Sequence, residues 1–205
     1  MPKNLTPLFG LIVIGCFAPR SAFSYEGYAS LTTDQKSSLA AGEQITITQE
    51  REGSAYPTVW VLKLTNSTPA EAMAVYADFA SRKEYQPYVV GTQVIEGAGK
   101  AQSVVDWEID VPVLGRKHTL YRHELSQEHC ALRLRSESIQ PPVGFESEVS
   151  NLSVERIVQK DLGQPGPTTL IVFKTTVHAS WWTSLMYYRA KFLGSYQATM
   201  TALLK

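Results

Sequence analysis

The end of the chain, from Leu170 to Lys205, constrains the fold most strongly. Residues 170–179 alternate between two faces and include many β-branched and aromatic side chains, which predicts a strand. Apolar residues then recur at helical spacing over Ser184–Leu204, which predicts a helix of about 20 residues and about 30 Å. The wide aromatic face of this helix needs a large apolar partner, so we expect the rest of the chain to form a sheet.

The preceding segments indicate short antiparallel strands and short helices. Thr68-Pro69-Ala70-Glu71 is a capping box with proline at the first helical position, and the helix that it opens should end near Arg82–Tyr85. A further short helix is expected over Thr33–Ala41. Because no strand–helix–strand repeat occurs, the predicted class is α+β. Strands are expected over residues 44–50, 58–64, 92–96, 101–111, 117–127, 131–138 and 148–159.

The composition fits one globular domain. The chain has 205 residues, of which 44% are hydrophobic and 19% charged. The formal net charge is +0 and no basic run stands out, so nucleic acid is not expected as a partner.

The N-terminus has the pattern of a signal peptide. Lys3 provides a positive start, and Pro7–Ala18 is an almost unbroken apolar run, shorter than the ~20 residues that a membrane span needs. Ala22 and Ser24 then occupy the small-residue positions of a cleavage site before Tyr25. We therefore expect a protein exported to the periplasm or the medium; a buried N-terminal helix is the alternative.

The domain boundaries follow from this cleavage site. Residues 1–24 are interpreted as the signal peptide and residues 25–205 as one domain. A second export route is open, because Val13-Ile14-Gly15-Cys16 resembles a bacterial lipobox, although leucine is usual at its first position. Acylation of Cys16 would anchor the protein to a membrane. Either export route removes or modifies Cys16, so Cys130 would be the one free cysteine and no disulfide could form within the mature chain.

No sequence motif indicates a metal, a nucleotide or a catalytic nucleophile, so no cofactor is expected. His118 and His123 are five residues apart in one predicted strand and should point to opposite faces. Asp106, Glu108 and Asp110 share a strand face; they could do acid–base work, but their apolar alternates favour a solvated outer face.

These elements together resemble the helix-grip fold of the StAR-related lipid-transfer (START) domains, the birch-pollen-allergen family and the polyketide cyclases. Asn66–Val94 carries the resemblance best, and Tyr85, Pro87 and Val90 match the passage from helix to strand in that family. The segment Leu39–Glu43 is similar to the entry of exported bacterial START-like proteins.

The resemblance covers the chain from about Ser38 to its end. It implies a curved antiparallel sheet wrapped around a long C-terminal helix, with a short helix pair after the second strand. It also implies an apolar cavity between sheet and helix for a lipid, sterol, quinone or polyketide.

The expected ligand site follows from strand and helix faces. Two polar residues fall on strand faces that are otherwise expected to be apolar and inward. His123 shares a face with Tyr121, and Arg156 shares one with Leu152 and Val154. Both could hold a ligand headgroup, or Arg156 could pair with a carboxylate at a strand end. The expected ligand-binding residues are Trp107, Tyr121, His123, Arg156, Phe173, Val177, Tyr188 and Phe192, with Trp60 also assigned to an inward face.

Three functions remain open from the sequence. The first is a monomeric, non-enzymatic carrier of a lipid, sterol, fatty acid or quinone, with transient membrane contact. The second is an enzyme of the cyclase or aromatase kind that uses His123 and Tyr121. The third is an interaction module whose interior is a filled core without a ligand.

Overall fold

The computed structural model describes residues 27–111, 115–128, 131–141, 144–157, 168–179, 193–195 and 197–199. Nine of its elements precede β6: a single turn η1 (Tyr28–Ser30), α1 (Thr33–Ala40), β1 (Ile45–Gln49), β2 (Thr58–Thr65), α2 (Pro69–Ala77), a single turn η2 (Ala80–Glu84), β3 (Val89–Glu96), β4 (Gln102–Val111) and β5 (Gly115–Glu128). The remaining strands are β6 (Ala131–Gln140), β7 (Phe145–Arg156) and β8 (Thr169–Ala179).

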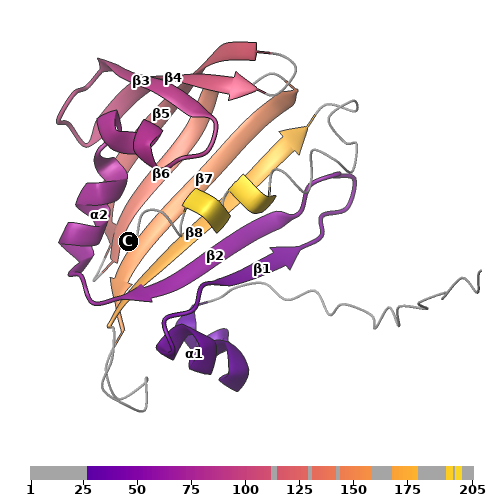
Figure 1. Cartoon of the computed structure of the whole chain (residues 1–205), viewed down its shortest axis with the longest axis vertical. Helices are drawn as coiled ribbons and strands as arrows, with labels where there is room; N and C mark the ends of the chain where they lie inside the picture. Colours follow the sequence, from indigo (N-terminus) through magenta and orange to yellow (C-terminus); the bar gives the residue numbers. More distant parts are fainter. Residues whose placement is uncertain are drawn as a thin grey trace, which may run out of the picture.

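The strands form one curved sheet in the order β1-β2-β8-β7-β6-β5-β4-β3 (Figure 1). Every neighbouring pair is antiparallel, and only the β2–β8 contact joins strands far apart in the sequence. The α+β class predicted from the sequence is confirmed, and the observed strand bounds lie within a few residues of those expected.

Both described α-helices begin with a capping box. The Thr68 hydroxyl accepts a hydrogen bond from the Glu71 backbone N–H at 3.2 Å, and the Thr68 backbone N–H donates to the Glu71 carboxylate at 2.8 Å. Thr32 and Gln35 form the same reciprocal pair at the start of α1. After α2 the chain leaves helical geometry at Asp78 and turns through η2, so α2 and η2 are the short helix pair expected after the second strand.

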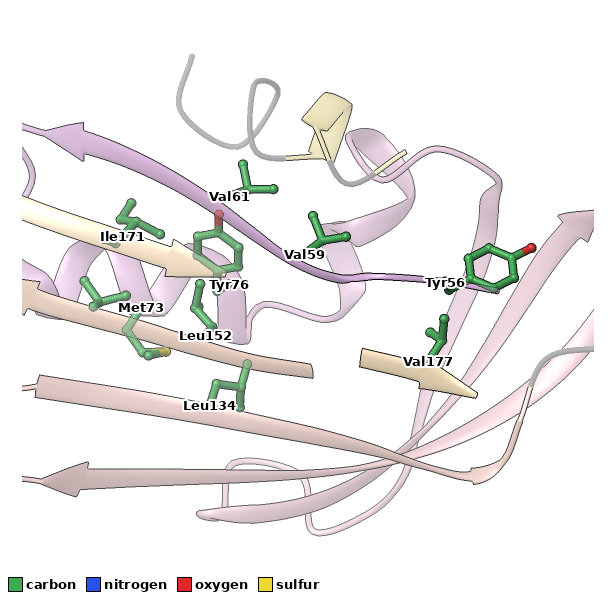
Figure 2. Close-up of a cluster of buried hydrophobic side chains, with 11 residues drawn as sticks. Tyr56, Val59, Val61, Met73, Tyr76, Leu134, Leu152, Ile171 and Val177 are labelled. Carbon is green, nitrogen blue, oxygen red and sulfur yellow. The ribbon is translucent and has the colours of Figure 1, made fainter. Parts of the chain in front are cut away.

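Apolar side chains cluster on both faces of the sheet. Figure 2 shows Met73 and Tyr76 of α2 lying against Leu134, Leu152 and Ile171 of the sheet. We call this face, covered by α2, the inner face.

The opposite, outer face is covered by α1. Its cluster joins Leu39 of α1 to side chains of alternate parity on β1, β2 and β8. Trp60 belongs to this cluster, so its predicted inward position is wrong. The physical reason is that β2 is covered on both faces, with Val59 and Val61 on one and Trp60 and Leu62 on the other.

The C-terminal segment contributes helical residues to the inner face. Residues 193–195 and 197–199 are helical, and they are the short yellow coils in front of the sheet in Figure 1. Leu193 packs against the inner-face cluster, and the Gln197 side chain donates to the Thr46 hydroxyl at 3.1 Å. The other residues of the predicted helix over Ser184–Leu204 lie outside the described residues. Within the described part of the chain, no helix has the length and apolar character that crossing a membrane requires.

Candidate functional site

Four aromatic rings meet on the inner face of the sheet, below the passage from α2 to β3. Trp107 on β4 and Tyr121 and His123 on β5 bring their rings to within 6.2 Å of one another, measured between centroids. Phe79, between α2 and η2, lies 4.3 Å from the His123 ring and 6.4 Å from the Trp107 ring. Strand parity predicted that Trp107, Tyr121 and His123 lie on inward strand faces, and the three side chains are buried together on the inner face.

His123 is a buried imidazole with one of its two nitrogens unpaired. Its side chain is 3% exposed, and Nδ1 lies 2.7 Å from the Ser136 hydroxyl. Nε2 has no hydrogen-bond partner in the described part of the chain. Burial, and secondarily the positive charge of Arg82, lowers the pKa of His123 to about 3. The imidazole is therefore neutral at physiological pH.

Arg82, in η2, is a buried cation beside this cluster. Its guanidinium lies 5.5 Å from the centroid of the Trp107 ring and 5.8 Å from that of Phe79. Nη1 donates to the Gln86 side-chain oxygen at 3.1 Å, and Nε and Nη2 donate to the Tyr76 carbonyl. None of the ion pairs among the described residues involves Arg82. Burial lowers its pKa.

Tyr121 and Glu148 form a second polar pair on the inner face. The Tyr121 hydroxyl donates to the Glu148 carboxylate at 2.5 Å. The Glu148 backbone N–H in turn donates to the Ser138 hydroxyl at 2.8 Å, which ties β7 to β6 at this point. A carboxylate and a phenol in contact could orient a bound hydroxyl or exchange a proton with it.

Three buried polar side-chain atoms lack a partner among the described residues. They are the indole Nε1 of Trp107, the imidazole Nε2 of His123 and the hydroxyl of Thr175 on β8. Leaving a buried polar atom unpaired costs about 1–3 kcal/mol of folding free energy, so such atoms are rare in well-packed protein cores. All three residues have inner-face parity. Together they can donate to and accept from polar atoms of a bound molecule.

The other predicted site residues have different positions. Phe173 and Val177 of β8 belong to the inner-face cluster that α2 covers. Arg156 is the last residue of β7 and its side chain is exposed, so the inward position expected for it is not observed. The strand ends there, and Arg156 is not a member of the inner-face cluster that contains Leu152 and Val154. Tyr188 and Phe192 lie outside the described residues.

The acidic residues of β4 lie on the outer face, as their alternation with buried residues predicted. Asp106 pairs with His118 at 3.0 Å and Glu108 with Arg116 at 3.2 Å, both on the solvent side. Among the described residues, no group of histidine, cysteine and acidic side chains could hold a metal ion. With their partners His118 and Arg116, these carboxylates form part of a charged outer surface.

Sequence reasoning missed several residues that the structure adds to the site, among them Phe79 and Ser136. Thr175 and its cross-strand partner Ser150 share strand parity with Phe173 and Leu152, so polar residues on a predicted inward face were the available signal. Glu148 could have been found in the same way. Arg82 carries no periodic signal, because it lies in a single turn after α2.

Comparisons with known proteins agree on the fold. No protein-family model matches the chain, and no curated protein matches it by sequence. Human StAR-related lipid transfer protein 5 superimposes with a TM-score of 0.61 at 10% identity, over 80% of each chain. A STAR-related lipid transfer protein from Xanthomonas axonopodis gives 0.59 at 11% identity, over 79% of this chain and 94% of that one.

A biosynthetic protein is also similar. The di-domain aromatase/cyclase BexL of the BE-7585A pathway gives a TM-score of 0.51 at 11% identity, over 82% of this chain and 50% of that one. At these identities the comparisons establish the fold alone. The chain has a START-like helix-grip fold, as the sequence resemblance predicted.

Proposed function

We propose that the protein binds a small hydrophobic ligand against the inner face of its sheet and acts as a carrier. The single observation that carries the proposal is the set of unpaired buried atoms on Trp107, His123 and Thr175. They lie beside aromatic and aliphatic side chains, which is the usual composition of a small-molecule site: mostly apolar with a few polar groups. The START-like fold supports the proposal, since two similar structures are lipid transfer proteins. As a carrier, the protein would work as a monomer with transient membrane contact.

Native mass spectrometry of protein purified from its own host tests the carrier function. We expect a noncovalent adduct of small mass that is lost on denaturation and is recovered in an organic extract. A bare chain mass, together with no saturable binding of sterols, fatty acids, phospholipids or quinones, would favour a filled core without a ligand.

Replacing Trp107 with phenylalanine should weaken ligand binding while keeping an aromatic ring in place. The change removes the unpaired indole N–H. Loss of one buried hydrogen bond to the ligand should lower the affinity by about five- to tenfold. Titration of the tightest-binding member of the ligand panel measures the effect.

Trp60→Phe is the matched control, because Trp60 is equally buried but belongs to the outer-face cluster. We expect it to leave the affinity within about twofold of the wild type. Equal losses in the two variants would point to a general effect on stability and against a site at Trp107.

Catalysis of the cyclase or aromatase kind is the second candidate function. The contact between Tyr121 and Glu148 favours it, as does the similarity to BexL. A general base works best when its pKa lies near the operating pH, and the pKa of His123 is about 3. We therefore place binding first. Conversion of the recovered ligand on incubation, stopped by Glu148→Gln, would reverse this order.

We also propose that residues 1–24 direct export and are then removed. The support is the sequence pattern alone, with its apolar run and its small residues at Ala22 and Ser24. Sequencing of the mature N-terminus should give Tyr25. An acylated Cys16 would make the protein a membrane-anchored lipoprotein, and an intact Met1 would contradict both routes.

A further inference from the structure

A row of polar side chains crosses the inner face of the sheet, with one member on each of five neighbouring strands. Each member is the direct cross-strand partner of the next in the register. The order from β4 to β8 is Ser103, His123, Ser136, Ser150 and Thr175. We call these five residues the polar row.

The polar row is buried. Thr175 is 0% exposed and Ser103 and Ser150 are each 8% exposed, while Ser136 is half-buried and contacts His123 Nδ1. The row nevertheless keeps unused hydrogen-bonding capacity, at Thr175 Oγ1 and His123 Nε2. Packing alone does not explain this arrangement, because apolar side chains of similar size would avoid the cost of burying unpaired polar atoms.

Two further rows of cross-strand partners flank the polar row, one on each side, and they differ in chemistry from each other. The first row runs from β2 to β6 under α2, and all its members are apolar. On the other side Tyr121 and Glu148 are bonded to each other. The apolar row consists of Val61, Phe173, Leu152 and Leu134, paired in that order. The inner face therefore carries a polar strip beside an apolar row.

We propose that the polar row selects a ligand with a polar face: an apolar skeleton with several hydroxyl or carbonyl oxygens along one side. The inference rests on the proposed function and specifies its ligand class. Neighbouring strands lie about 4.8 Å apart, so a ligand lying across the strands meets a new polar partner at about that interval. A ligand with one polar end would satisfy one member of the row and leave the others against hydrocarbon.

The chemistry of the row favours uncharged oxygens. Serine and threonine hydroxyls both donate and accept, and His123 is neutral, so each member can pair with a hydroxyl, and most with a carbonyl.

A matched pair of rigid probes tests the inference. Cholic acid and 5β-cholanic acid share one steroid skeleton and one carboxylate, but only cholic acid carries hydroxyls along one face. Calorimetric titration of the mature protein should show cholic acid binding at least about tenfold more tightly. Ser150→Ala and Thr175→Val should each lower the affinity for cholic acid by about five- to tenfold. Each variant should leave the affinity for 5β-cholanic acid within about twofold of the wild type.

Ser153→Ala is the control, because it removes the same hydroxyl from the same strand on the outer face, where Ser153 pairs with Val172. We expect it to change neither affinity. If Thr175→Val loses the fold, Ser150→Ala alone decides. Equal binding of the two probes, unchanged by the variants, would overturn the inference and leave the proposed function standing. No saturable binding of either probe would overturn the inference, and the ligand panel would then decide the proposed function separately.

Discussion

Replacing His123 with glutamine should remove much of the acid sensitivity of the folded protein. The pKa of His123 is about 3 in the folded state, against 6.5 for an ordinary imidazole. Between these values the unfolded chain binds a proton that the folded protein does not, so the free energy of unfolding falls as the pH falls. The contribution of neutral His123 is complete above about pH 6.5 and is lost toward about pH 3, at about 1.4 kcal/mol per pH unit.

Urea unfolding at about pH 7 and about pH 4.5 measures this effect. His123 should account for a loss of about 2–3 kcal/mol in the wild type between these conditions, which the His123→Gln variant should not show. His118→Gln is the control, because His118 is exposed on the outer face and paired with Asp106. A His123→Gln variant that loses stability with acid as steeply as the wild type would show that burial does not hold this imidazole neutral.

Replacing Arg82 with alanine should lower the free energy of unfolding by about 2–4 kcal/mol. The change removes a buried side chain that packs against Phe79 and Trp107, and it removes the two hydrogen bonds that Arg82 donates to the Tyr76 carbonyl. Chemical unfolding at neutral pH measures the loss.

Two further variants separate the packing of Arg82 from its charge. Lys83→Ala changes the next residue of η2, which is exposed, and should stay within about 0.5 kcal/mol of the wild type. Arg82→Met keeps an apolar stem without the cation that helps to lower the pKa of His123, so that pKa should rise. An unchanged His123 titration in Arg82→Met would mean that desolvation alone lowers the pKa.

Strand parity predicted most of the sheet and part of the site. It failed where both faces of the sheet are buried. On β4 and β5 one face meets solvent, so alternation separated Trp107 from Asp106. On β2 five consecutive residues are buried, so parity gave two apolar faces and no basis for assigning Trp60. Arg156 has the expected parity, but β7 ends at that residue.

Other parts of the site depend on long-range register. Ser150 and Thr175 are adjacent only because β7 and β8 pair in one particular alignment, which neither strand specifies alone. Arg82 is buried because η2 folds back against β3 and β4, a consequence of tertiary packing rather than of local pattern. Strand parity assigns Ser150 and Thr175 to the inner face, but their adjacency and the burial of Arg82 are set only by the assembled sheet.

The most direct test of a ligand site on the inner face follows the imidazole nitrogens of His123 by NMR while a hydrophobic ligand is titrated. We expect the Nε2 resonance of His123 to shift in proportion to the bound fraction, because this buried atom gains a partner. His118 and His178, which are exposed, should not shift. Saturable binding that leaves the His123 resonances unchanged would contradict a ligand site on the inner face of the sheet.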